Sequence, residues 1–319
     1  MKYRPMVVFA LEGSRPFAER VAERLDVPLA PHEERSFEDG EHKARPLQTV
    51  RGQDAFVLHS LHGDAHESAN DKLCRLLFFC GALRDAGASS VTAVTPYLCY
   101  ARKDRRTKAN DPITTRYVAA LFEAIGIDRV IAVEVHNVAA FENAFRCPTI
   151  HIECAPLLAV HFAPLLRGHQ VVAVSPDAGG AKREEAFRLE LQRLIDMDVG
   201  SAFMEKSRSG GVVSGELLAG DVRGKVAVIV DDLISTGGTL VRAARACRAA
   251  GATRVYAAAA HGLFMGGAPE LMTEPSIDGI VVANTVPSFR LSAESAARLT
   301  ILDASEAVAA AIASCRDGG

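Results

Sequence analysis

One stretch in the second half of the chain constrains the fold most strongly. Residues 226–230 are five consecutive apolar residues, and Asp231 and Asp232 follow them directly. A hydroxyl- and glycine-rich turn comes next, and a helical pattern begins at Leu240. Apolar runs of this length are typical of a strand that is buried on both faces of a sheet. The stretch therefore predicts a buried strand with two carboxylates at its carboxyl end, followed by a turn and a helix.

The turn at 235–239 has the chemistry of an anion site. A helix N-terminus offers unpaired backbone N–H groups and the positive end of the helix dipole. Gly237 and Gly238 let the backbone approach a phosphate closely, while Thr236 and Thr239 add hydroxyl donors. Ligands of open α/β sheets bind outside the carboxyl ends of the strands. The alternative is a surface turn in which the two Asp residues only cap the helix.

Short apolar runs alternate with helical patterns along the rest of the chain. Such alternation indicates parallel sheets covered by helices on both faces. A break near 147–148 predicts two consecutive α/β domains, 1–148 and 149–319, with a last helix at 305–315 that could pack on the first domain. The predicted strands are 7–11, 55–59, 91–95, 130–135, 171–174, 226–230, 255–259 and 280–282, and the predicted helices are 16–25, 70–86, 114–125, 183–196 and 240–250.

Two segments fit neither pattern. Residues 102–111 are strongly charged and predict a loop before a helix, because Pro112 follows them. Residues 210–224 contain five glycines, which predicts a long mobile loop.

Composition limits the classes of protein to consider. The chain has 36 Lys and Arg against 39 Asp and Glu, a net charge of −3 that excludes a general nucleic-acid binder. Its seven cysteines are scattered, which disfavours a zinc site or a disulfide framework and favours a reduced, cytoplasmic protein. Glu12 interrupts the first apolar run, so no signal peptide is expected, and no run reaches the ~18 apolar residues of a membrane span.

The string from Asp231 to Thr239 resembles the phosphoribosyl-pyrophosphate loop that phosphoribosyltransferases share with ribose-phosphate pyrophosphokinases. Four further segments resemble the pyrophosphokinases and not the transferases. They are F-E-D-G-E at 37–41, P-Y-L-C-Y-A-R-K-D-R-R at 96–106, V-E-V-H at 133–136 and S-P-D-A-G-G at 175–180. Their order and spacing make the chain similar to the ribose-phosphate pyrophosphokinase family over most of its length.

This resemblance implies a fold and an activity. The fold would be two consecutive phosphoribosyltransferase-like domains, each a mainly parallel sheet flanked by helices. The activity would be that of a Mg²⁺-dependent transferase of nucleotide biosynthesis, a ribose-phosphate diphosphokinase. It moves the βγ-diphosphoryl group of ATP to the 1-hydroxyl of ribose 5-phosphate, which gives AMP and phosphoribosyl pyrophosphate. A homo-oligomer, at least a dimer, is implied because subunits of the family share sites.

The resemblance also implies roles for individual residues. Ribose 5-phosphate would be bound by Asp231, Asp232, Ser235, Thr236, Gly237, Gly238 and Thr239. ATP would be bound by Phe37, Asp39, Gly40, Glu41, Arg102, Lys103 and Asp104, with Phe37 flanking the adenine from a neighbouring subunit. His136 would be a magnesium ligand and Asp177 a second metal site, and Lys206 and Arg208 would stabilise the transition state.

Other interpretations stay open at this point. The basic segment 102–108 alone could be a solvated loop or an RNA patch, a lone histidine at a strand end is more often structural, and a Lys-x-Arg pair is common on surfaces. For the whole chain, one alternative is a non-catalytic regulatory homologue that binds nucleotide. The other is a phosphoribosyltransferase, or a regulator built on that fold.

Overall fold

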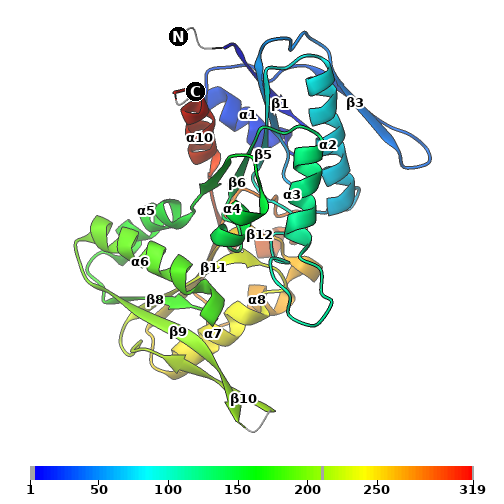
Figure 1. Cartoon of the computed structure of the whole chain (residues 1–319). Helices are drawn as coiled ribbons and strands as arrows, with labels where there is room; N and C mark the ends of the chain where they lie inside the picture. The colour runs from blue at the N-terminus through cyan, green and yellow to red at the C-terminus, as the bar shows by residue number, and fades with distance from the viewer. Residues whose placement is uncertain (1–3, 210–211, 318–319) are drawn as a thin grey trace. The chain divides into compact units, whose positions relative to one another are not determined.

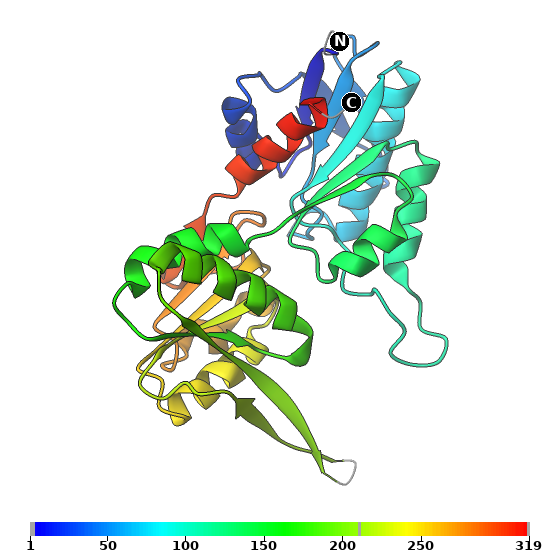
Figure 2. The ribbon, with the colours of Figure 1, turned by 60° about the vertical axis from the view of Figure 1, so that its left-hand side comes forward.

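The computed structural model describes residues 4–209 and 212–317, with the backbone alone at 206–209, 212–216 and 316–317. The chain divides into two compact units. The first holds the residues up to Ile152 and those from Ser305 onward, and the second is Glu153–Ala304. The last helix thus belongs to the first unit, where it packs against α1. Each unit is a sheet with helices on both faces, which Figures 1 and 2 show from two sides.

Parallel strands form the sheet of the first unit, in the order β1-β4-β5-β6-β7. The strands are β1 (Met6–Ala10), β4 (Asp54–Leu58), β5 (Ser90–Thr95), β6 (Arg129–Val133) and β7 (Thr149–Ile152). The helices are α1 (Arg15–Arg24), α2 (Ala69–Asp85), α3 (Thr114–Ala124), α4 (Val138–Ala144) and α10 (Ser305–Asp317). A separate antiparallel hairpin, β2 (His32–Ser36) with β3 (His42–Pro46), lies against α2.

The second unit has the strand order β10-β9-β8-β11-β12-β13-β14, and only β10 runs antiparallel to its neighbour. The strands are β8 (Val171–Ser175), β9 (Val199–Ser209), β10 (Val212–Ala219), β11 (Val226–Ile234), β12 (Arg254–Gly262), β13 (Gly279–Ala283) and β14 (Leu299–Leu302). The helical elements are α5 (Ala155–Leu166), η1 (Ala178–Gly180), α6 (Ala181–Ile195), α7 (Gly238–Ala249), η2 (Met265–Gly267), α8 (Pro269–Thr273) and α9 (Ala293–Ala296).

The buried central strands explain why the apolar runs predicted the sheets correctly. All five residues of β8 are buried, and so are the first five of β11. Strands covered by helices on both faces bury every side chain, and therefore read as continuous apolar runs. Every predicted strand and helix lies within a few residues of an observed one, and the mainly parallel α/β fold class is confirmed.

The prediction of a long mobile loop at 210–224 was wrong for residues 212–219, which form β10, while residues 210–211 lie outside the described part of the chain. β10 pairs with β9 from Val212 opposite Ser209 to Ala219 opposite Phe203. The glycines suggested a loop, but the valine and leucine residues around them favour a strand. A register shift between Val213 and Glu216 accommodates the positions that do not fit regular pairing. The result is a two-stranded ribbon, which Figure 2 shows projecting from the second unit.

No helix of the described chain combines the length and the apolar character that crossing a membrane requires.

A buried ion pair fixes the segment after β4 in the first unit. The side chain of Lys72 is 1% exposed, and its Nζ lies 2.5 Å from Oδ2 of Asp64. Burial alone would raise the pKa of Asp64. The bond from Lys72 and the backbone N–H groups of Glu67 and His66 outweigh it, so this pKa falls well below its usual range. The pair therefore stabilises the fold above the ordinary carboxyl pKa and loses that contribution at strongly acidic pH.

We expect Asp64→Asn to lower the free energy of unfolding by about 3 kcal/mol at pH 7, because it leaves a buried ammonium without its counter-charge. Asp221→Asn is the matched control: Asp221 pairs with Lys225 at 3.1 Å, but its side chain is 72% exposed. An exposed pair of this kind contributes about 1 kcal/mol or less. Urea unfolding of both variants measures the difference, and equal losses would contradict the assignment.

Candidate active site

The candidate site of the second unit lies where the strand order of its sheet reverses. From β8 the chain adds β9 and β10 on one side, then crosses to β11 on the other side and continues outward. β8 is parallel to both β9 and β11, so their carboxyl ends share one edge of the sheet. Such a switch point is where open α/β sheets bind ligands. The residues predicted for sugar phosphate, metal and catalysis in this unit all follow or end these three strands.

The two carboxylates near the end of β11 lie close together and largely buried. The side chains of Asp231 and Asp232 are 19% and 7% exposed, and Nη1 of Arg183 lies 3.9 Å from an Oδ1 atom of each. Burial raises the pKa of Asp231 well above the usual carboxyl range, and the hydrogen bond and charge of Asp232 act in the same direction. The pair therefore favours a ligand that supplies hydroxyl donors or positive charge.

The turn after β11 opens helix α7 with its backbone held in one conformation. Gly237 precedes the helix at a φ of 85°, in the left-handed region. A Cβ atom at this position would lie 2.6 Å from Cβ of Leu271, so the site requires glycine. The first N–H groups of α7, from Gly238 onward, have no partner within the helix and can receive an anion.

The loop after β8 presents an exposed carboxylate. Oδ1 of Asp177 accepts hydrogen bonds from the backbone N–H groups of Gly179, at 2.8 Å, and Gly180, at 3.1 Å. The hydroxyl of Ser175 donates to the carbonyl oxygen of Asp177 at 2.6 Å. These bonds fix the orientation of the Asp177 carboxylate beside the acidic pair of the neighbouring strand.

The two predicted catalytic residues lie on the ribbon. Ser175, the last residue of β8, is opposite Phe203 on β9, so the strand continues past the sheet edge through Lys206 and Arg208. The backbone of Lys206 pairs with Glu216 and that of Arg208 with Val213. Their side chains lie outside the described part of the chain.

In the first unit, the basic segment lies beside the end of β6. Nδ2 of Asn137 donates to Oδ2 of Asp104 at 2.7 Å, which places Asp104 next to the bend that contains the exposed His136. Nζ of Lys103 lies 2.8 Å from Oδ2 of Asp111, so this lysine is bound within its own loop. Arg102 is exposed. The structure thus brings Arg102, Lys103, Asp104 and His136 to one edge of the first sheet.

The F-E-D-G-E residues form the turn of the β2–β3 hairpin. The N–H of Phe37 donates to the carbonyl of Glu41 at 2.8 Å, and Gly40 has a φ of 89°. Phe37 is 41% exposed, with the guanidinium of Arg35 5.1 Å above its ring centre. Figures 1 and 2 both show this turn well away from the loop after β5 in the same unit. One chain therefore does not bring the two sets of predicted ATP residues together.

Sequence reasoning did not assign a role to Arg183. Its guanidinium links the first turn of α6, just after the Asp177 loop, to the acidic pair on β11. The sequence did contain a signal for Arg183: it lies six residues after Asp177, at the start of a helix. From that position a long side chain can reach back over the edge of the sheet.

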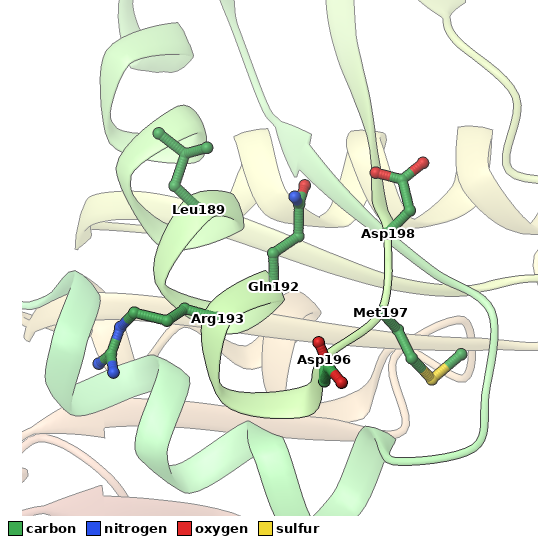
Figure 3. A pocket seen from close by; sticks show the side chains of 6 residues that line it. All are labelled: Leu189, Gln192, Arg193, Asp196, Met197 and Asp198. Atoms are coloured by element: carbon green, nitrogen blue, oxygen red, sulfur yellow. The ribbon is translucent and has the colours of Figure 1, made fainter.

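Figure 3 shows a hollow at the other end of α6, before β9 begins. None of the predicted site residues line it; its lining is Leu189, Gln192, Arg193, Asp196, Met197 and Asp198. No group of three or more His, Cys, Asp or Glu residues that could hold a metal ion occurs within the described residues.

Known proteins resemble this chain along most of its length. A family model described as the N-terminal domain of ribose phosphate pyrophosphokinase matches residues 6–126, and one described as the phosphoribosyl synthetase-associated domain matches residues 215–318. The ribose-phosphate pyrophosphokinase of Caldanaerobacter subterraneus subsp. tengcongensis is 37% identical over 281 residues, which cover 88% of this chain and 85% of that protein. Ribose-phosphate pyrophosphokinase 1 of Streptococcus agalactiae is 34% identical over 91% of this chain and 89% of its own length.

A solved structure supports the same relationship. The crystal structure of phosphoribosylpyrophosphate synthetase from Mycobacterium smegmatis superimposes with a TM-score of 0.88 and 31% sequence identity. The match covers 99% of this chain and 100% of that one.

The raised pKa of Asp231 predicts a stability that depends on pH. Above about pH 4 the folded state keeps a proton that the unfolded chain has lost, so the stability of the wild-type protein falls as pH rises toward the folded-state pKa. Asp231→Asn removes this pH-dependent loss of stability. In buffer without divalent cations it should raise the free energy of unfolding by about 1 to 2 kcal/mol, since a shift of one pKa unit corresponds to about 1.4 kcal/mol. The gain should be larger at about pH 8 than at about pH 5.

Thermal unfolding at the two pH values measures this effect, with Asp221→Asn as an exposed carboxylate control. If the Asp231→Asn variant is less stable than the wild-type protein, or if its gain in stability does not grow with pH, the proposed effect of burying Asp231 beside Asp232 is contradicted.

Proposed function

The chain belongs to the ribose-phosphate pyrophosphokinase family, and on this premise we propose that it transfers the βγ-diphosphoryl group of ATP to the 1-hydroxyl of ribose 5-phosphate. The products are AMP and phosphoribosyl pyrophosphate. The observation that carries the proposal is the second unit's switch point, where a buried acidic pair adjoins a helix-opening turn built for an anion.

The turn and the acidic pair divide the recognition of ribose 5-phosphate between them. The 5-phosphate accepts hydrogen bonds from the backbone at Gly237, Gly238 and Thr239 and from the hydroxyls of Ser235, Thr236 and Thr239. The ribose hydroxyls donate to Asp231 and Asp232. These donors stabilise the ionised carboxylates, which burial and mutual repulsion disfavour in the free protein.

His136 in the first unit is a proposed magnesium ligand, and Asp177 in the second unit is proposed as a second metal site. The exposed Asp177 carboxylate, held by two backbone N–H groups, suits an ion that prefers oxygen and is often bound through one or two carboxylates and substrate phosphates. When bound, Mg²⁺ neutralises negative charge on the phosphates of ATP.

ATP is bound by the exposed cation of Arg102 with Lys103 and Asp104, and by the hairpin turn of a second copy of the chain. A guanidinium binds phosphate oxygens and stacks on a purine ring. Because Phe37, Asp39, Gly40 and Glu41 lie far from this loop within one chain, a homo-oligomer supplies them to the neighbouring site. The scattered cysteines agree with a cytoplasmic location.

The chemical step is an in-line displacement at the β-phosphorus of ATP. The 1-hydroxyl of ribose 5-phosphate forms the new P–O bond and releases its proton to solvent, while the bond from the β-phosphorus to the α–β bridging oxygen breaks and AMP leaves. Phosphoryl transfer depends mainly on positioning and charge neutralisation. Lys206 and Arg208 meet the negative charge that develops on the transferred group and on AMP.

A product assay with ATP, Mg²⁺ and ribose 5-phosphate tests the proposal. We expect AMP and phosphoribosyl pyrophosphate in equal amounts, and no ADP. Lys206→Ala should lower kcat by about a hundredfold or more, with little change in the affinity for ribose 5-phosphate, because it removes charge needed in the transition state. Lys225→Ala removes a lysine of the same unit that pairs with the exposed Asp221, and should leave turnover unchanged.

The other outcomes separate the alternatives. ATP binding without turnover would favour a regulatory homologue, and no ATP binding would favour a transferase. Near-normal turnover of the Lys206 variant would contradict the role of the ribbon.

A further inference from the structure

The turn that opens α7 is held by the chain that follows β12. The carbonyl oxygen of Ile234 accepts hydrogen bonds from the backbone N–H groups of Leu263, at 2.9 Å, and Phe264, at 3.1 Å. The carbonyl oxygen of Ser235 accepts one from Met265 at 3.0 Å. Successive peptide groups of the turn are thus fixed by a segment about thirty residues later in the chain.

The same later segment presses against the glycine of the turn. A Cβ at Gly237 would lie 2.8 Å from Cδ2 of Leu271 and closer still to its Cβ, so the Leu271 side chain packs directly on the backbone of the turn. Leu271 is completely buried on α8, a helix that packs against α7. We name residues 261–271 the loop brace.

The loop brace has a backbone that its sequence alone does not favour. Phe264 and Ala268 have φ values of 45° and 42°, in the left-handed region, and both are buried. Bulky non-glycine residues adopt this conformation only where surrounding structure imposes it. The tight turn also depends on Gly262, where a Cβ would lie 2.4 Å from the ring of Phe264.

A buried hydrogen-bond chain fixes the beginning of the loop brace. The hydroxyl of Thr285, after β13, donates to the carbonyl oxygen of Ala260 at 3.0 Å, and its Oγ1 lies 2.7 Å from Nδ1 of His261. Because Thr285 has only one hydroxyl proton, Nδ1 of His261 must be the donor in the second bond. The imidazole is therefore held in one orientation, at the point where β12 leaves the sheet.

We propose that the loop brace is a positioning element for ribose 5-phosphate, with Leu271 and the His261–Thr285 pair as its positioning residues. It holds the peptide groups of the turn in the conformation that binds the 5-phosphate before the ligand arrives. None of these side chains needs to touch the substrate. The inference rests on the proposed function, because it concerns the same sugar-phosphate site.

Two pairs of variants test the proposal in the full-length protein. Leu271→Ala is matched with Leu191→Ala, an equally buried leucine on α6, on the other face of the sheet. Thr285→Val removes the hydroxyl that binds His261, and is matched with Thr92→Val, because the buried hydroxyl of Thr92 has no hydrogen-bond partner among the described residues. Should Leu271→Ala fail to fold, Leu271→Val and Leu191→Val replace that pair.

Calorimetric binding of ribose 5-phosphate, steady-state KM values and melting temperatures are measured for each variant. We expect Leu271→Ala and Thr285→Val to weaken ribose 5-phosphate binding by at least about tenfold and to raise its KM similarly, since small displacements of positioning groups are costly. The KM for ATP should change by less than about twofold. The control variants should keep wild-type affinity for ribose 5-phosphate, even if Leu191→Ala lowers the melting temperature as much as Leu271→Ala does.

Equal ribose 5-phosphate affinity in the variants and their controls would overturn the positioning role while leaving the proposed function intact. Failure of the wild-type protein to bind ribose 5-phosphate would contradict the proposed function itself, and the inference with it.

Discussion

The placement of two carboxylates near the end of a strand whose apolar residues are all buried is the constraint on which the rest of the site depends. β11 lies inside the second sheet, so its position is fixed by packing on both faces, and Asp231 and Asp232 are carried to the edge with it. The turn, the helix dipole of α7, the Asp177 loop and Arg183 are all arranged around this pair. The free protein bears the cost of two adjacent, largely buried acids, and in our proposal the hydroxyl donors of a sugar offset that cost.

Both units are mainly parallel sheets covered by helices on both faces, but the residues at their sheet edges differ in charge and chemistry. The first places a basic, exposed loop beside His136, and the second places acids beside a glycine-containing turn that opens helix α7. A nucleoside triphosphate suits the first set and a sugar monophosphate the second. The hairpin turn with Phe37 lies well away from the basic loop of its own unit, which is why we infer that the ATP site is shared between copies of the chain.

The sequence predicted most where local pattern and packing agree. Residues 226–240 contain their own strand, acids, turn and helix start, and the order of these elements was predicted correctly because each depends on neighbouring residues. The strand runs four residues further than predicted, through both acids to Ile234, and the helix begins two residues earlier, at Gly238. The β2–β3 hairpin was missed because its strands are polar, and it is held instead by contacts such as those of Glu33 with Arg45, at 2.6 Å, and Lys43, at 3.3 Å. The left-handed conformation of Phe264 is imposed by tertiary contacts, so no pattern in the sequence predicts it. The glycines of the β9–β10 ribbon predicted a loop where the structure has a strand.

We propose that Asp231 and Asp232 recognise the ribose hydroxyls while the turn binds the 5-phosphate. The most direct measurement is the calorimetric affinity of the wild-type protein for ribose 5-phosphate against 2-deoxyribose 5-phosphate, which differ by one hydroxyl. Loss of a hydroxyl leaves a buried carboxylate without its donor, so we predict binding at least about tenfold weaker for the deoxy sugar. Equal affinity for the two sugar phosphates would contradict the account.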